Sequence, residues 1–395
     1  MFDFKQNPPL SLYIHFPWCL QKCPYCDFNS HAIAAGEAPE SAYIDALIRD
    51  LEFELPRIWG RRLISVFIGG GTPSLLSAQA LDRLMSVLRS HLNIHSEIEI
   101  TLEANPGAAE ADRFAAYRQM GINRLSIGVQ SFADEKLKRL GRIHDGDNAV
   151  NAIVMAQAAG FENINIDLMF GLPDQTLDEA ISDLRIALEQ KPSHISWYQL
   201  TIEPNTVFYK QPPVLPDDDD IWAMQQQGKV LLQESAFKQY EISAYALPKQ
   251  HSVHNTNYWQ FGDYLGIGAG AHGKLTDVAN GMICRFVRHR IPDSYMQKAG
   301  AEQVITQQTR LNRADVSLEF MMNALRLTEG INTALFLQRT GLPISVIDAQ
   351  LQDAEKRGLL EWDIEKLKPT AFGLRYLNDL LQIFMPSESK QPSEL

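Results

Sequence analysis

The segment Cys19-Leu20-Gln21-Lys22-Cys23-Pro24-Tyr25-Cys26 places three cysteines within eight residues of a 395-residue chain. Its C-x3-C-x2-C spacing directly follows an apolar run at residues 11–16, which we expect to form a strand. Thiolates are the ligands of iron–sulfur clusters, and three of them in a short loop can hold three irons of a [4Fe–4S] cubane. The fourth iron then lacks a protein ligand and can bind another molecule. We therefore predict a cluster at Cys19, Cys23 and Cys26.

A zinc knot is the alternative for this loop. Structural zinc sites use four ligands, usually as two spaced pairs. The nearest further candidates, His15 and His31, do not have common zinc spacing, so the cluster is favoured. Crowded cysteines in a reducing compartment indicate metal or redox chemistry rather than a disulfide framework. The fourth cysteine, Cys284, stands alone, and we expect a buried, inert thiol there.

Strand and helix patterns alternate from this loop to about residue 236. The predicted strands span residues 11–16, 64–68, 97–102, 124–129, 163–169 and 194–200, and the helices between them include 78–92, 109–120 and 177–189. Such alternation favours parallel strands with helical crossovers. Several strands are apolar at nearly every position, which indicates that both faces are covered. An open doubly wound sheet and a full or partial (β/α) barrel both fit this pattern.

The second half of the chain shows a different pattern. The expected elements are a helix at 221–235, a strand at 240–245, an irregular stretch at 248–275, a helical region from about 305 and a hairpin near 359–367. The Ser/Pro/Glu-rich residues 386–395 are predicted to form a disordered tail. We divide the chain into a core at 1–236 with its cysteine loop at 17–30, an extension at 237–304 and a small C-terminal domain at 305–380.

Composition limits the functions that the chain can have. The formal net charge is −12, which disfavours general nucleic-acid binding because that binding depends on neutralising phosphates. Residues 1–11 lack the basic start and apolar core of a signal peptide, and no apolar run is long enough to cross a bilayer. We therefore expect a cytoplasmic protein.

The cysteine loop resembles the signature of the radical S-adenosylmethionine (SAM) superfamily. This resemblance implies that the open iron chelates the amino and carboxylate groups of SAM, and that reduction cleaves SAM to a 5′-deoxyadenosyl radical. It also implies an α/β fold, a partial (β/α)6 barrel with extra C-terminal strands and a small, mainly helical C-terminal domain. Active sites on such barrels lie at the C-terminal ends of the strands, where the cysteine loop is expected.

The turn after the second predicted strand matches the family's glycine-rich segment at Gly70, Gly71 and Thr72. In the family this backbone meets the SAM amino group, and glycine permits such close approach. Taken alone, the turn would indicate only a tight loop. Tyr13 and Tyr25 could pack against the cluster or the adenine, or could belong to the core.

Polar residues at the ends of the next strands are further candidates for SAM binding. Glu103, Gln130 and Asp167 lie at or near the ends of strands three, four and five, where they could hydrogen-bond a ribose or an amino group. Their alternative role is helix capping or solvation of loops. Arg142, after the fourth strand, could meet the SAM carboxylate or could be a surface cation.

Longer motifs resemble the oxygen-independent coproporphyrinogen III oxidase group over roughly residues 10–380. The motifs are Tyr13-Ile14-His15-Phe16-Pro17-Trp18-Cys19 and residues 69–73, 128–132 and 166–173. The group holds true oxidases and a sister branch of HemW-type heme chaperones. The oxidases carry a fourth cysteine two positions after the third, where this chain has Phe28, and a longer N-terminal extension. Both differences favour the chaperone branch.

A third feature favours the same branch. His254-Asn255-Thr256-Asn257-Tyr258-Trp259 matches the chaperones' H-N-x-x-Y-W motif, which is linked to heme. Histidine is a standard ligand of heme iron, and the two aromatic residues supply flat apolar surface. We therefore predict heme contacts at His254, Asn255, Tyr258 and Trp259. A packed histidine with a satisfied ring is the alternative, and His251 and His272 are further candidate ligands in the same stretch.

The favoured hypothesis is a chaperone that holds a [4Fe–4S] cluster and SAM, binds heme and passes it to apo-hemoproteins such as those of the respiratory chain. It includes no catalytic residue. The competing hypotheses are an oxidase that decarboxylates two propionates of coproporphyrinogen, and a radical enzyme with another substrate, such as a methylase. We expect the C-terminal domain to cover the open barrel mouth or to dock a recipient protein. The oligomeric state stays open, with a homodimer among the states to test.

Overall fold

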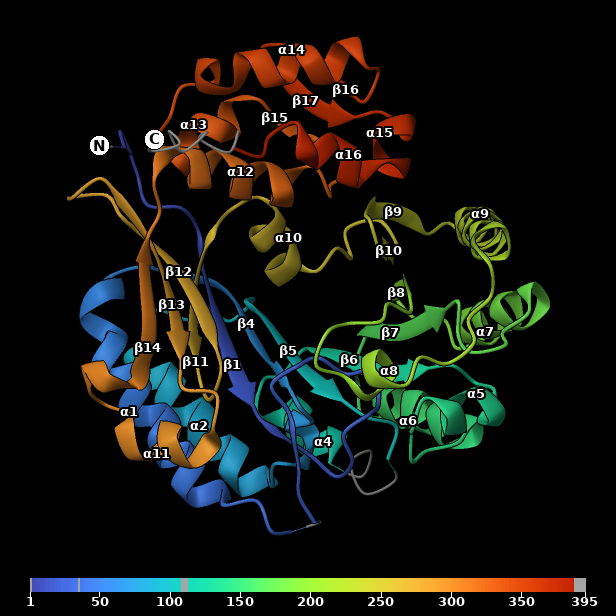
Figure 1. Cartoon of the computed structure of the whole chain (residues 1–395). Helices are drawn as coiled ribbons and strands as arrows, with labels where there is room; N and C mark the ends of the chain where they lie inside the picture. The colour runs from blue at the N-terminus through green and yellow to red at the C-terminus, as the bar shows by residue number, and fades with distance from the viewer. Residues whose placement is uncertain (1, 35, 108–112, 387–395) are drawn as a thin grey trace, which may run out of the picture.

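The computed structural model describes residues 2–34, 36–107 and 113–386. Its main body is one 12-stranded mixed sheet, curled so that helices cover its outer face (Figure 1). The six central strands run parallel and are β1 (Leu10–Phe16), β4 (Leu63–Gly70), β5 (Glu99–Ala104), β6 (Arg124–Gln130), β7 (Asn163–Phe170) and β8 (His194–Gln199). The end strands β14 and β9 do not pair with each other, so the barrel is not closed.

All six predicted parallel strands are confirmed, with ends that differ by one or two residues. The helices that cover them are α1 (Glu40–Ile58), α2 (Ala78–His91), α4 (Phe114–Gln119), α5 (Asp134–Arg139), α6 (Gly146–Ala158), α7 (Leu177–Glu189), α8 (Val207–Lys210) and α9 (Asp218–Glu234). The helix expected at 109–120 is described only as α4, because residues 108–112 lie outside the described residues. The alternation of strand and helix therefore predicted the core of the fold.

Alternate residues of each strand face opposite sides of the sheet. In β1, Leu12 and Ile14 pack into the main hydrophobic core with Tyr43 of α1. Tyr13 and His15 instead face the barrel interior, where the Tyr13 hydroxyl lies 2.9 Å from His15 Nδ1. The apolar strands thus bury their outer face under helices and leave a largely polar interior.

The structure corrects the prediction of an irregular stretch at residues 248–275. This stretch contains the helix α10 (Val253–Trp259) and the strands β11 (Asp263–Ile267) and β12 (His272–Asp277). β11 extends the sheet by pairing in parallel with β1, and β12 returns antiparallel to it. These strands are five and six residues long, so neither shows enough periodicity to be recognised alone.

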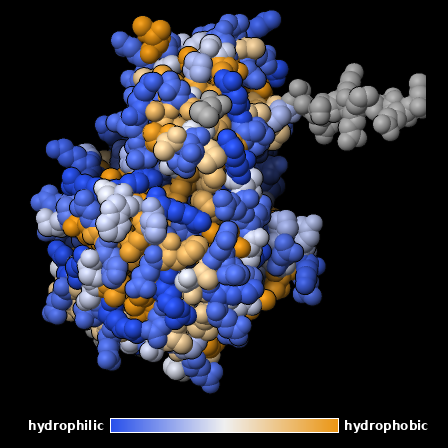
Figure 2. Space-filling model, turned by 90° about the vertical axis from the view of Figure 1, so that its left-hand side faces the viewer, coloured by the Kyte–Doolittle hydropathy of each residue, from blue (hydrophilic) through white to orange (hydrophobic). Residues whose placement is uncertain are grey.

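Two further expectations beyond residue 236 are wrong in detail. The strand expected at 240–245 is a hairpin of β9 (Lys238–Glu241) and β10 (Ala244–Ala246). Residues expected to be helical from 305 begin as β14 (Ile305–Arg310), which pairs with β13 (Met282–Arg288) after α11 (Pro292–Lys298). β14 is a polar edge strand, so it lacks an apolar pattern, and its polar side chains protect the open edge. Figure 2 shows the side of the molecule that lies on the left in Figure 1, and there hydrophilic side chains lie between the hydrophobic ones.

The C-terminal region is mainly helical and has its own hydrophobic core. Its helices are α12 (Arg313–Ala324), α13 (Ala334–Thr340), α14 (Asp348–Lys356), α15 (Ala371–Arg375) and α16 (Leu377–Gln382), beside a sheet of β15 (Ile331–Asn332), β17 (Lys366–Pro369) and β16 (Leu360–Trp362). β16 and β17 confirm the hairpin expected near 359–367. The tail expected to be disordered lies outside the described residues from residue 387 onward.

The C-terminal region packs against α10 at the amino ends of the parallel strands (Figure 1). The cysteine loop follows the carboxyl end of β1, at the opposite end of the barrel. The C-terminal region therefore lies at the amino end of the barrel, away from the cysteine loop. None of the helices in the described part of the chain is both long and apolar enough to cross a membrane.

Candidate functional site at the carboxyl end of the barrel

The three cysteines of the loop lie half-buried at the carboxyl end of β1. Cys19 ends β2 (Trp18–Cys19), which pairs with β3 (His31–Ala32) and so closes the loop at its base. A turn brings Cys26 N within 3.1 Å of Cys23 O. Lys22 Nζ donates to the carbonyl oxygens of Phe28 and Ser30, each at 3.1 Å, and holds the second half of the loop. All three thiols are free of disulfides.

The donor set fits a [4Fe–4S] cluster. Among the described residues, no three His, Cys, Asp or Glu side chains form a group that could hold a single metal ion. A cubane places each thiolate on a different iron, so convergence on one point is not needed. The guanidinium of Arg142 lies beside the loop, with Nη1 3.7 Å from Cys23 Sγ. Burial raises the pKa of Cys19 and Cys26, so iron would have to displace these protons on binding.

The glycine-rich turn packs tightly against the cysteine loop. Gly70 has a φ of 117°, and a Cβ there would lie 2.5 Å from the His15 ring. A Cβ at Gly71 would lie 2.5 Å from the carbonyl oxygen of Trp18. Thr72 N donates to the same Trp18 oxygen at 2.8 Å. These glycines are therefore required by close contacts within the chain, whatever else their backbone meets.

Arg142 and Gln130 lie near the same end of the barrel. Arg142 Nη2 donates to Asn105 Oδ1 at 2.7 Å, and Asn105 Nδ2 donates to the hydroxyl oxygen of Thr72 at 2.8 Å. This chain of contacts connects the arginine to the glycine-rich turn. Gln130 sits at a strand bulge with a φ of 70°, and its Oε1 accepts from the Tyr198 hydroxyl at 2.9 Å. The sequence did not point to Asn105 or Tyr198, although both lie at or just past strand ends.

Two half-buried carboxyl groups, Glu103 and Asp167, line the interior below this turn. Glu103 Oε2 accepts from Gly70 N at 2.9 Å, and burial raises the Glu103 pKa to about 8. Asp167 accepts from Ser126 Oγ and Asn165 Nδ2, each at 2.8 Å, and burial raises its pKa as well. At neutral pH Glu103 is therefore mostly protonated and can donate a hydrogen bond as well as accept one.

The two tyrosines of the prediction occupy different positions. The Tyr13 ring stacks on Phe67 at a centroid distance of 6.2 Å, inside the barrel. Tyr25 lies within the cysteine loop and packs against Phe208 at 6.4 Å. A pocket opens beside this loop, lined among others by Cys23, Asn105, Gly141, Arg142 and His144. The structure thus places Cys23 and Arg142 at one opening, and the glycine-rich turn packs against the same cysteine loop. Glu103, Gln130 and Asp167 lie on the strands that lead to this end of the barrel.

The predicted heme motif lies at the other end of the barrel, on α10. Glu99 accepts from the backbone N–H groups of Val253 and His254, each at 2.9 Å, and so fixes the start of this helix. His254 is only 8% exposed, and its Nδ1 lies 3.0 Å from Ser65 Oγ. Burial lowers the His254 pKa to about 3, so the ring is neutral at ordinary pH.

The other motif residues do not form one flat surface with His254. Asn255 is half-buried, and its N–H bonds the capping hydroxyl of Ser252. Tyr258 packs against Tyr264 at 4.9 Å. The ring of Trp259 lies under the guanidinium of Arg326 at 4.3 Å, in contact with the C-terminal region.

The alternative histidines lie at opposite ends of the barrel. His251 stacks on Tyr240 at 4.1 Å, beside the start of α10. His272 is exposed and begins β12, near the end where Asn29 of the cysteine loop donates to Ala269 O at 2.9 Å. The expectation that both lie near His254 is wrong for His272, because β11 carries the chain across the barrel between them.

Comparisons with known proteins agree with this architecture. Residues 13–186 match the family model described as the radical SAM superfamily, and residues 311–376 match the HemN C-terminal domain. The heme chaperone HemW of Escherichia coli is 50% identical over 96% of this chain and 98% of its own length. HemW of Haemophilus influenzae is 48% identical over 96% of this chain and 99% of its own.

A solved structure shares the whole architecture. The E. coli coproporphyrinogen III oxidase HemN, described as a radical SAM enzyme, superposes with a TM-score of 0.80 at 25% identity, over 96% of this chain and 90% of its own. The fold and site thus define a radical SAM protein with an open barrel. Within that class, the chain belongs to the family of the heme chaperone HemW.

Proposed function

We propose that the protein binds heme and transfers it to apo-hemoproteins, and that it holds a [4Fe–4S] cluster and SAM at the carboxyl end of its barrel. The observation that carries this proposal is the full-length identity of 50% to a relative named a heme chaperone. The residue at position 28 supports the proposal. The oxidases have their fourth cysteine there, whereas this chain has Phe28, which is 62% exposed. The proposal places the protein in the cytoplasm, with respiratory-chain proteins among the recipients.

Cys19, Cys23 and Cys26 would hold the cluster, which with SAM supplies one-electron chemistry when both are bound. Arg142 offers a half-buried positive charge beside Cys23 for the SAM carboxylate. Glu103 and Asp167 would orient hydroxyl or amino groups by hydrogen bonds, since burial keeps their protonated forms available. Gln130 and Tyr198 form a hydrogen-bonded pair that could accept one more polar group.

For heme, the proposal assigns His254 as the candidate ligand of the iron. Its ring is neutral, which iron ligation requires. The Ser65 hydroxyl donates to Ser11 Oγ at 2.7 Å, so the His254 Nδ1–H donates to Ser65 and leaves Nε2 with the lone pair. Because the ring is buried, heme could reach it only if α10 moved away from Glu99 and Ser65.

The second candidate function is that of an oxidase, which the structural likeness to HemN favours. An anaerobic experiment distinguishes this function from that of a chaperone. The cluster-replete protein is titrated with heme and, in parallel, assayed with coproporphyrinogen and SAM. We expect heme binding and no decarboxylation. Formation of protoporphyrinogen would reverse this ranking. In the variant His254→Ala, heme binding or transfer should fall while iron and SAM content stay unchanged. Unchanged heme transfer there would remove His254 from the proposed site.

A further inference from the structure

Arg124 is a buried cation to which the proposed function gives no role. It begins β6, its side chain points into the barrel, and the residue is 2% exposed. Its Nε atom is buried without a hydrogen-bond partner. Within residues 2–34, 36–107 and 113–386, no side chain forms an ion pair with it. An unpaired buried charge is strongly unfavourable, so this position calls for an anionic partner.

Thr101 of β5 supplies a second unpartnered donor at the same level. The register of β5 and β6 pairs Thr101 directly with Arg124. Thr101 is fully buried, and its hydroxyl also has no hydrogen-bond partner among the described residues. Side chains that pair in register on one face of a sheet lie about 5 Å apart. Two unsatisfied donors therefore lie side by side inside the barrel.

The acidic groups near Arg124 bond other partners, and none of those in the described residues forms an ion pair with it. Glu99, on the α10 side, already accepts from two backbone N–H groups and from Ser252 Oγ. Glu103 and Asp167, on the cysteine side, have pKa values raised by burial and bond other groups. The ring nitrogens of His194 are likewise committed, one to Asn165 and one to Tyr240.

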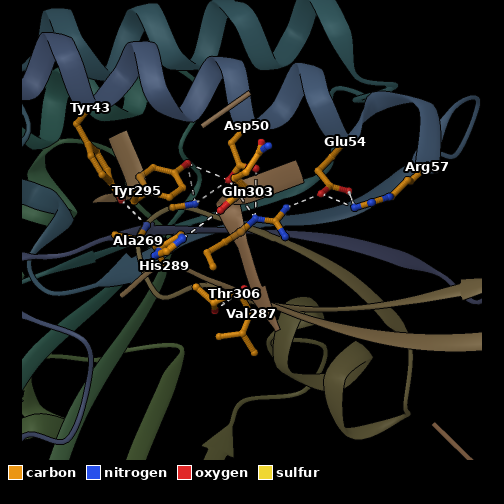
Figure 3. Close-up of polar contacts among 12 residues, drawn as sticks. Tyr43, Asp50, Glu54, Arg57, Ala269, Val287, His289, Tyr295, Gln303 and Thr306 are labelled. Atoms are coloured by element: carbon orange, nitrogen blue, oxygen red, sulfur yellow. Dashed lines mark hydrogen bonds and ion pairs between the residues drawn. The ribbon is translucent and has the colours of Figure 1, made fainter. Parts of the chain in front are cut away.

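Arg288 is a second buried arginine, and its structural role makes it a comparison for Arg124. It is 1% exposed, but its Nη2 lies 2.6 Å from Glu54 and its Nε lies 3.2 Å from Asp50. Tyr295 also donates to Asp50, at 2.9 Å (Figure 3). Every charge in that cluster has a partner from the chain. Arg124 is 2% exposed and forms no ion pair with any residue that the structure describes.

We infer that Arg124 and Thr101 form a binding site for a carboxylate group inside the barrel, between the cysteine end and α10. A guanidinium matches the two oxygens of a carboxylate in a planar fork, and the threonine hydroxyl can donate a third hydrogen bond. The carboxylate comes from a small organic acid or from a propionate of heme. The site itself does not depend on the proposed function.

Thermal unfolding of the anaerobic holoprotein tests this site with sodium propionate as the probe. Propionate should raise the melting temperature above that in sodium chloride of equal ionic strength, and neutral propionamide should not. Arg124→Met should abolish the response, and Thr101→Val should weaken it about tenfold in apparent affinity. A wild-type protein that does not respond, or a response that persists in Arg124→Met, would overturn the inference.

A matched pair of variants distinguishes loss of the binding site from misfolding. Without ligand, Arg124→Met should melt at or above the wild-type temperature, because it removes an unpaired buried charge. Arg288→Met removes a paired charge and should melt lower. If Arg124→Met were as destabilised as Arg288→Met, Arg124 would have a structural role and the inference would fail.

Heme and its dimethyl ester distinguish the two sources of the carboxylate. If a heme propionate occupies the site, the ester should bind wild-type protein on the order of tenfold more weakly than heme, and Arg124→Met should bind both alike. If both bind wild type equally while propionate still stabilises it, the occupant is a small organic acid. Failure to bind either porphyrin would count against the proposed function and leave the propionate result intact.

Discussion

The two ends of the barrel differ in how their functional groups are held. At the carboxyl end, Cys19, Cys23 and Cys26 lie half-buried in a loop that backbone and lysine contacts shape. At the amino end, His254 is buried beneath α10, with its ring bonded to Ser65. The first end can receive a cofactor from solvent without moving a helix. The second cannot, so any ligand of His254 must compete with contacts already made.

This difference also appears in what supports each end. Behind the cysteine loop, Tyr43 donates to His15 O at 2.7 Å and lies next to the ion pair of Asp50 and Arg288. Tyr43 also accepts from Ala269 N at 2.9 Å (Figure 3). This cluster holds the loop around Ala269, to which Asn29 bonds. An exposed cofactor site is thus backed by a rigid, fully paired interior.

The largest effect should come from the cysteines themselves. Alanine at Cys19, Cys23 or Cys26 should each abolish the cluster, because a cubane held by three thiolates loses a third of its protein ligands. Iron analysis after anaerobic reconstitution should give about four irons per chain in the wild type. Cys284→Ser is the control and should keep full iron, since Cys284 lies on β13, outside the loop. Full iron in a triple cysteine variant would contradict the prediction.

The support behind the loop is tested by Arg288→Met. Removing this guanidinium takes the ion pair away from buried Asp50 and leaves Glu54 with Arg57 alone, which should cost about 3–5 kcal/mol of unfolding free energy. Denaturant unfolding measures this loss. Arg83→Met is a matched control, because Arg83 makes an exposed pair with Asp45 and should cost less than about 1 kcal/mol. Equal losses would show that burial of the cluster contributes nothing.

The buried ring of His254 at the amino end predicts that the stability of the protein depends on pH. The His254 pKa is about 3 in the folded protein and near 6.5 in the unfolded chain. Between these values the unfolded state binds one more proton, so stability is lost as pH falls below 6.5, by about 1.4 kcal/mol per pH unit for this group. His254→Gln should flatten the slope between pH 6.5 and 5 by that amount. His15 and His144, with pKa values of about 4, contribute to the slope in both proteins. An unchanged slope would show that the ring is accessible.

The smallest effects concern SAM. Asp167→Asn and Gln130→Asn should each weaken SAM binding by about 1–3 kcal/mol through lost hydrogen bonds. Asparagine suits position 130 because it tolerates the positive φ found there. Equilibrium binding to the cluster-replete protein measures the loss. Gly70→Val is a poor probe, since its side chain would collide with His15 and change folding. Unchanged affinity in both asparagine variants would place the pocket elsewhere.

Much of the fold followed from local patterns. The six parallel strands and α2, α7 and α9 were found within a few residues, because apolar periodicity persists over each of them. β9, β10, β11 and β14 were missed or misassigned because they are short or polar, and only pairing with distant strands stabilises them. The cysteine loop could be predicted because its residues are adjacent in sequence.

The sequence by itself determined the three-thiol loop and the radical SAM class, since both follow from residues that are adjacent in the chain. Only the tertiary structure decided that Gly70 and Gly71 pack against His15 and Trp18, and that α10 closes the amino end over His254. It also decided that Arg124 lies in register with Thr101 and forms no ion pair with a described residue, while Arg288 pairs with Asp50 and Glu54. The reason is physical. Whether a buried charge is neutralised depends on groups brought together from distant segments, and no local pattern records which of them arrive.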